Sequence, residues 1–212
     1  MATTAAVGVA PFTGVTWPPP GQWLASAAPP ELCRAGVHAL LADGLATWTA
    51  EELWRVELDG ARELAPGIMV ASRGRLLGRV EAWNDQTARE FARACAEHVR
   101  DHASGRAAEY AADAAAAATE AVAGDSAARV GYIAAHAAEA MAPGGFAAER
   151  RWQSRWLADR LGVQARAAYP PDWIPLWEEL TPLDAARRRG AVELVAWLRT
   201  RGARAVAELH AS

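Results

Sequence analysis

His38 and Glu57 are the side chains of this sequence whose types best fit acid–base chemistry. An imidazole and a carboxylate can pass a proton to and from a bound molecule, and arginine or tryptophan can hold that molecule in place. We therefore predict His38 and Glu57 as catalytic residues. The predicted substrate-binding residues are arginines and tryptophans of the same half of the chain: Arg73, Arg75, Trp48, Trp54 and Trp83. The structural alternative is a hydrogen-bonded histidine at a helix start beside a salt-bridged strand face.

Metal binding is the second chemistry to weigh, because His98 and His102 are one helical turn apart. That spacing can place two imidazoles on one metal ion. However, Glu97 precedes His98, whereas the zinc-protease signature has its glutamate after the first histidine. His136 is not part of a repeated Glu-x-x-His pattern, as a di-metal bundle requires. We therefore predict packing roles for these histidines, with no metal and no cofactor.

The basic residues narrow the function further, because all 22 of them are arginine. Without lysine there is no Schiff-base chemistry, no pyridoxal-phosphate lysine and no P-loop lysine. The sequence contains neither a Gly-x-Ser-x-Gly nucleophile turn nor a glycine-rich phosphate loop after a strand. A formal net charge of −3 offers no broad basic surface, so nucleic acid is not an expected partner.

Cys33 and Cys95 are too few for a disulfide framework, which favours a reduced compartment. No apolar run approaches membrane-spanning length, and the first residues do not have the pattern of a secretory signal. We expect a cytoplasmic protein with a small-molecule ligand and no membrane partner. Homo-oligomerisation is left open.

The first half of the chain predicts a small antiparallel sheet. Residues 1–30 are rich in proline and punctuated by aromatic residues, which favours an extended segment across the domain. Leu40, Leu41, Leu45 and Trp48 recur at helical spacing, so a helix is expected after His38. Residues 53–59 alternate as a strand does and end in an Asp-Gly turn. Residues 68–83 predict one or two further strands.

The second half predicts a helical bundle. Asn84 or Asp85 can cap a helix that runs to residue 103, and residues 106–123 form an alanine-rich second helix. Asp125 is expected to cap the third helix, and residues 146–161 form the fourth, closed by Gly162. The fold class is therefore α+β, mainly α, with a small antiparallel sheet packed on a bundle-like C-terminal part. The expected division is 1–83 and 84–212.

Several motifs together resemble a family of actinobacterial proteins without an assigned activity. They are Gly36 followed by His-Ala, the segment ELWRVELDG, the strand SRGRL, VEAWN, YIAAHAA and ER-x-x-Q-x-x-WL, and they cover most of residues 12–162. The family often has a cysteine after His-Ala and a lysine near the second strand, where this chain has Leu40 and Met69. The resemblance implies no mechanism.

Residues 181–203 are similar to the helix pair of one ankyrin repeat, after a proline- and tryptophan-rich connector at 167–180. A single repeat cannot bury its apolar face alone, so this hairpin is expected to dock on the bundle.

Two functions follow from these patterns. The first is a cofactor-independent small-molecule enzyme of bacterial specialised metabolism, of cyclase, isomerase or hydrolase type, with a tryptophan-lined pocket. The alternative is a non-enzymatic interaction or regulatory protein that uses the ankyrin-like hairpin.

Overall fold

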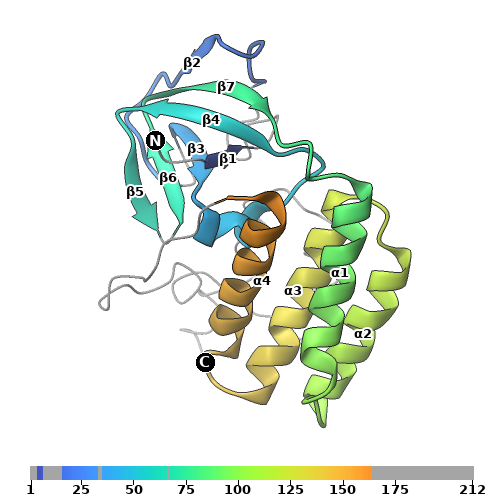
Figure 1. Ribbon diagram of the computed structural model, residues 1–212. Coiled ribbons are helices and arrows are strands. Elements are labelled where there is room, and N and C mark those ends of the chain that lie inside the picture. The colour runs from blue at the N-terminus through green and yellow to red at the C-terminus, as the bar shows by residue number, and fades with distance from the viewer. Residues whose placement is uncertain (1–3, 7–15, 33–34, 66, 164–212) are drawn as a thin grey trace.

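The computed structural model describes residues 4–6, 16–32, 35–65 and 67–163, and shows a curled antiparallel sheet at one end of a helical bundle (Figure 1). This is the α+β class that the sequence predicts. The connector at 167–180 and the ankyrin-like hairpin at 181–203 lie outside the described residues.

Within the described residues, the sheet has seven short strands. They are β1 (Thr4–Ala6), β2 (Trp23–Ala25), β3 (Val37–Leu40), β4 (Trp54–Asp59), β5 (Arg62–Ala65), β6 (Ile68–Ala71) and β7 (Arg73–Arg79). Their order across the sheet is β2-β7-β4-β1-β3-β6-β5, and every pair is antiparallel. The predicted strands at 53–59 and 68–83 are confirmed, and the predicted turn has Gly60 at φ 65°.

The sheet curls strongly enough for β3 to reach β7, although β4 and β1 lie between them in the strand order. A Cβ atom added to Gly74 would lie 2.9 Å from Cγ1 of Val37, so glycine is needed at this crossing. The apolar side chains enclosed by the curl form what we call the inner-face cluster: Trp17, Val37, Ala39, Val56, Ala71 and Leu76.

The helix that the sequence predicts after His38 is confirmed only in part. Residues Val37–Leu40 form strand β3, and only Ala42–Trp48 are helical, as the 3-10 helix η1. All four residues of β3 are buried. A strand buried on both faces loses the alternation of apolar and polar residues, so its pattern cannot be told from that of a buried helix.

Four long helices form the bundle: α1 (Asp85–Arg100), α2 (Arg106–Glu120), α3 (Gly124–Met141) and α4 (Gly145–Leu161). The Asn84 cap is confirmed, since its Oδ1 accepts a hydrogen bond from Thr87 N–H. Gly162 ends α4 in the left-handed conformation, also as predicted. The predicted cap position at Asp125 is wrong: α3 begins at Gly124 with Ala123 at the N-cap position, and Ser126 Oγ accepts hydrogen bonds from the N–H groups of Val122 and Ala123.

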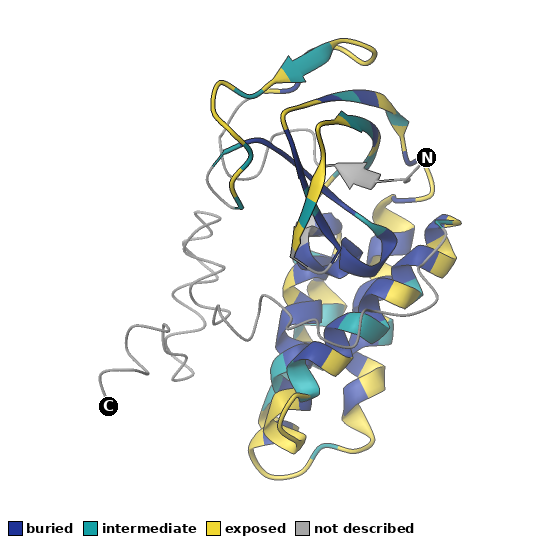
Figure 2. Ribbon diagram, turned by 90° about the vertical axis from the view of Figure 1, so that its left-hand side faces the viewer, coloured by how far each residue is buried: buried dark blue, intermediate teal, exposed yellow. Residues whose placement is uncertain are grey.

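The bundle core is made largely of alanine, which lets the helices approach closely, and Figure 2 shows buried residues on the sides that face one another. Larger side chains fill the end beside the sheet. Phe91 of α1 contacts both Trp83 and Trp156. Within the described residues, no helix is long and apolar enough to cross a membrane.

Candidate functional site

The predicted residues Glu57, Arg73 and Arg75 lie on the outer face of the sheet, opposite the inner-face cluster. Arg75 donates to Glu57 through Nε at 2.8 Å, and Arg73 donates to Asp59 at the same distance. The centres of the two guanidinium groups lie 4.6 Å and 4.9 Å from the ring centroid of Trp23. The structure therefore brings the two arginines together, but a carboxylate already balances the charge of each.

His38 lies on β3 and not at a helix start. Its side chain is buried, and Nδ1–H donates to the carbonyl oxygen of Gly36 at 3.2 Å. Burial lowers the pKa of His38, and hydrogen bonds with the backbones of Gly36 and Glu31 offset part of that shift. In the strand order, β1 separates β3, which carries His38, from β4, which carries Glu57. A catalytic role for His38 stays a prediction.

Two of the predicted tryptophans, Trp54 and Trp83, lie in different parts of the protein. Trp83 is buried in the bundle core and donates from Nε1 to the carbonyl oxygen of Ala50 at 2.7 Å. Trp54 is half-buried against the inner-face cluster and donates to Glu52 at 3.0 Å. The side chain of Trp48 lies outside the described part of the protein.

A second group of polar residues lies inside the bundle, on the side of α4 that meets η1. We call it the α4 polar cluster, and its members are Glu149, Arg150, Gln153 and Ser154. Each is at most 3% exposed. Charged groups are rarely buried this deeply unless hydrogen bonds replace their lost water, so the partners of this cluster decide what it does.

Gln153 is the centre of the cluster, because its amide group uses all of its polar atoms. The oxygen accepts from Arg150 Nη1 at 2.5 Å, while Nε2 donates to Glu149 Oε1 at 2.8 Å and to Gly131 O at 2.9 Å. A Cβ atom on Gly131 would lie 3.0 Å from Gln153 Oε1. The small residue on α3 therefore makes room for the amide.

Arg150 and Ser154 join the cluster to η1. Arg150 Nη2 donates to the carbonyl oxygen of Ala46, and Ser154 Oγ accepts from Ala46 N–H at 3.1 Å. The guanidinium group of Arg150 also lies 4.3 Å from the ring centroid of Tyr132, whose hydroxyl donates to Thr47 O. These contacts hold the segment between β3 and β4 against the bundle.

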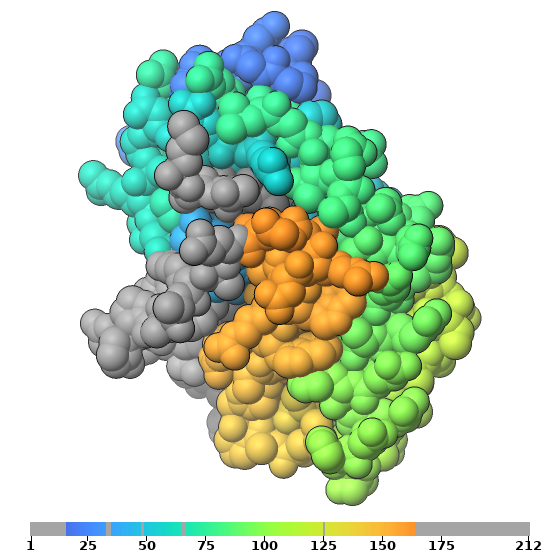
Figure 3. Space-filling view, in the orientation of Figure 1, coloured from blue at the N-terminus to red at the C-terminus, as the bar shows by residue number. Residues whose placement is uncertain are grey.

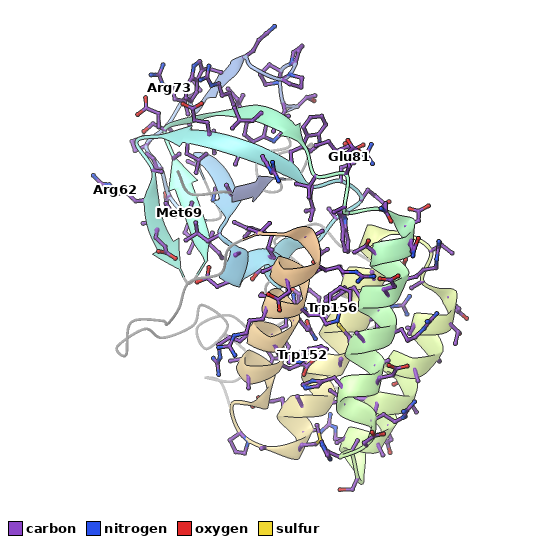
Figure 4. All side chains as sticks on the ribbon, in the orientation of Figure 1. Arg62, Met69, Arg73, Glu81, Trp152 and Trp156 are labelled. Carbon is purple, nitrogen blue, oxygen red and sulfur yellow. The ribbon has the colours of Figure 1, made fainter. Side chains whose placement is uncertain are left out.

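The other end of the cluster reaches the surface at His98. Its Nδ1 lies 2.7 Å from Glu149 Oε2, and its ring stacks on Trp152 with a centroid distance of 3.8 Å and an interplanar angle of 3°. The His98 side chain is 42% exposed, whereas that of Glu149 is 2% exposed. Figure 4 shows Trp152 and Trp156 on the side of α4 that faces α1, and Figure 3 shows both helices at the surface there.

His136 of α3 lies deeper in the bundle, between the rings of Tyr110 and Phe146. Burial is the main reason that its pKa falls to about 4, and the positive charges of Arg150 and Arg106 lower it further. The imidazole is therefore neutral at pH 7. It is a base too weak to remove protons at that pH.

Two other chemistries find little support in the described residues. No group of three or more His, Cys, Asp or Glu side chains there could hold a metal ion. His102 lies beyond the end of α1, whereas the sequence predicts it on the same helix as His98. Cys95 is fully buried, and burial raises its pKa well above the usual value, which leaves it a thiol and a poor nucleophile.

The sequence analysis did not recognise the pairing of His98 with Glu149. The two residues are 51 positions apart on different helices, and no local pattern joins them. A signal was nevertheless present in ER-x-x-Q-x-x-WL: Glu149 and Gln153 are one turn apart on a face that also carries Leu157. Polar residues at the core spacing of a helix indicate a buried network.

No family model, no curated protein and no solved structure matches the chain.

Proposed function

We propose that the protein is a cofactor-independent enzyme that moves a proton within a small molecule, with His98 as the proton-transferring residue. The observation that carries the proposal is the hydrogen bond of 2.7 Å between His98 Nδ1 and Glu149 Oε2. A buried carboxylate behind a surface imidazole is the arrangement that acid–base enzymes use to orient histidine and to stabilise its charged form.

The direction of that hydrogen bond indicates which nitrogen of His98 would take part in the proposed chemistry. An ionised carboxylate only accepts hydrogen bonds, so Nδ1 of His98 is the donor. In the neutral imidazole Nε2 then carries the lone pair, and no hydrogen bond joins it to the described residues. Nε2 can take a proton from a bound molecule, and Glu149 stabilises the imidazolium that results.

Both members of the pair are held in place by their neighbours. Gln153 fixes the Glu149 carboxylate, and Trp152 stacks against one face of the His98 ring. Side chains held in this way lose little further freedom when a substrate binds, which favours the reaction.

The proposed reaction class follows from the protons that His98 and Glu149 can take up and return without another reactant. A proton taken by Nε2 from one carbon or oxygen atom can be returned to another atom of the same molecule, as in an isomerisation or a cyclisation. Hydrolysis needs only water in addition. Trp152 offers an apolar surface beside the imidazole, which suits a compact substrate with an apolar part.

The test compares the wild-type protein with His98→Gln and Glu149→Gln. Each protein is incubated with a small-molecule extract of bacterial cells, and mass spectrometry follows which compounds disappear and which appear. We expect wild-type turnover of a compound into an isomer or a hydrolysis product. In His98→Gln the rate should fall by about 100-fold or more, the usual contribution of a general acid–base residue.

The matched control is His102→Gln, which removes an exposed histidine from the chain just beyond the same helix. Its turnover should equal that of the wild type. Unfolding curves of all three variants show whether a lost rate reflects lost structure. Turnover by His98→Gln at the wild-type rate, or the absence of any consumed compound, would contradict the proposal.

A further inference from the structure

Three tryptophan indoles of the sheet end differ in whether their N–H group has an acceptor. Trp83 donates to Ala50 O and Trp54 donates to Glu52. Trp17 is 7% exposed, and its Nε1 is buried without a hydrogen-bond partner. A buried indole N–H normally finds an acceptor, so the Trp17 donor needs an explanation of its own.

The described residues that share the inner-face cluster with Trp17 are apolar. Trp17 packs in the inner-face cluster with valine, alanine and leucine side chains of β3, β4, β6 and β7. The free energy that the indole N–H group loses on leaving water is therefore not offset by a hydrogen bond to the cluster. An oxygen atom of a ligand could accept a hydrogen bond from Trp17 Nε1–H and offset this cost. The apolar surroundings would strengthen that hydrogen bond.

The edge of the same cluster is apolar and partly open to solvent. Leu24, Trp54, Leu58 and Met69 pack against the cluster, and each is only half-buried. They come from β2, β4 and β6, three separate strands of the curled sheet (Figure 1). A buried donor beside partly exposed apolar side chains is the composition of a binding site for a non-polar molecule with one polar atom.

We propose that the inner face of the sheet binds a small, uncharged and largely non-polar molecule whose carbonyl or ether oxygen accepts a hydrogen bond from Trp17 Nε1–H. A charged ligand fits poorly, because the cluster contains no side chain of opposite charge. The inference is independent of the proposed acid–base function, since it shares no residue with the His98–Glu149 pair.

The test uses two probes of nearly equal size, 1-indanone and indane, of which only 1-indanone has an acceptor oxygen. Indole N–H signals of the ¹⁵N-labelled wild-type protein are followed by NMR as each probe is added. With 1-indanone the Trp17 signal should move downfield and saturate. The signals of Trp54 and Trp83, whose N–H groups already have acceptors, should move less.

The affinities of the protein for the two probes provide a second test. The wild type should bind 1-indanone about tenfold more tightly than indane, a difference of about 1.4 kcal/mol. Trp17→Phe should bind both probes equally. The matched control is Trp23→Phe, on the outer face of the sheet, which should keep the wild-type preference.

The wild-type measurements need no variant to fold, because contacts of the indole with methyl groups of the inner-face cluster can assign the Trp17 signal. Equal affinity of the wild type for the two probes would overturn the proposal. So would a Trp17 signal that does not move, or the absence of saturable binding by either probe.

Discussion

At the scale of single residues, the Nδ1 atom of His98 is where the proposed chemistry can be checked without a substrate. The Glu149 carboxylate accepts from it, so the neutral imidazole should keep its proton on Nδ1. Glu149→Gln replaces that acceptor with an amide that can also donate, and should move the proton toward Nε2. Ring ¹⁵N chemical shifts of labelled histidine report the tautomer. The same tautomer in both proteins would mean that Glu149 does not orient His98.

His136 should make the protein sensitive to acid. Its pKa is about 4 in the folded protein against 6.5 for an unperturbed histidine, so the unfolded chain binds its proton first as the pH falls. The stability that depends on neutral His136 is complete above pH 6.5 and is lost as the pH falls to about 4. The loss should reach about 3 kcal/mol.

His136→Phe keeps a ring between Tyr110 and Phe146 but removes the titrating group. The free energy of unfolding, measured with urea from pH 7 to pH 4, should fall less steeply in this variant than in the wild type. His102→Gln, which removes an exposed histidine, should follow the wild-type curve. Parallel curves for His136→Phe and the wild type would show that His136 is not the group responsible.

Sequence patterns say little about which single residues pair with one another, because the partners can be far apart in the chain. The proposed pair of His98 and Glu149 is 51 positions apart. His38 is singled out by the sequence because it is expected at the start of a helix, yet the structure buries it in a strand. His98 looked like an ordinary packing histidine until Glu149 was placed beside it. The type of a residue is visible in a sequence, whereas its partner depends on how the helices pack.

At the scale of elements, Gly67 is a position that only glycine can occupy without strain. Its φ is +69°, and a Cβ atom there would lie 2.4 Å from the backbone nitrogen of Gly44 in η1. Gly67→Ala should therefore lower the free energy of unfolding by about 2 kcal/mol or more, from left-handed strain and backbone overlap together.

Gly78→Ala is the matched control for Gly67→Ala. Nothing lies within 4 Å of a Cβ atom at Gly78, and its φ is not positive. That variant should stay within about 0.5 kcal/mol of the wild type or be slightly more stable. Urea unfolding compares the two variants. Equal stabilities would mean that η1 does not approach the turn before β6 as closely as the structure shows.

The elements were the most predictable part of the protein. The four helices and the strands β4, β6 and β7 follow patterns of apolar residues, and Asn84 and Gly162 mark helix ends by well-understood rules. The sequence-based assignment fails for elements to which neither kind of rule applies. β3 has no alternation, β2 is only three residues long, and α3 has an alanine at its N-cap position with Ser126 accepting from the backbone there.

At the scale of the whole molecule, Arg150 holds the segment between β3 and β4 on the bundle. Arg150→Met removes the donors to Gln153 and Ala46 and leaves their oxygen atoms buried without that partner. The free energy of unfolding should fall by about 3 kcal/mol. Arg155→Met, an exposed position one turn further along α4, should change it by no more than about 0.5 kcal/mol. Similar losses in the two variants would remove Arg150 from this role.

The strand that comes first in the chain lies in the middle of the sheet, between β3 and β4. Without β1, the hydrogen-bonded sheet would consist of two separate three-stranded parts, β2-β7-β4 and β3-β6-β5. The N-terminal segment and the rest of the chain should therefore reassemble when they are supplied as two separate pieces. A truncated chain that begins at residue 16 should bind a synthetic peptide of residues 1–15 and regain native tryptophan fluorescence, whereas a scrambled peptide should have no effect. If the truncated chain is as stable alone as the full chain, β1 does not join the two parts.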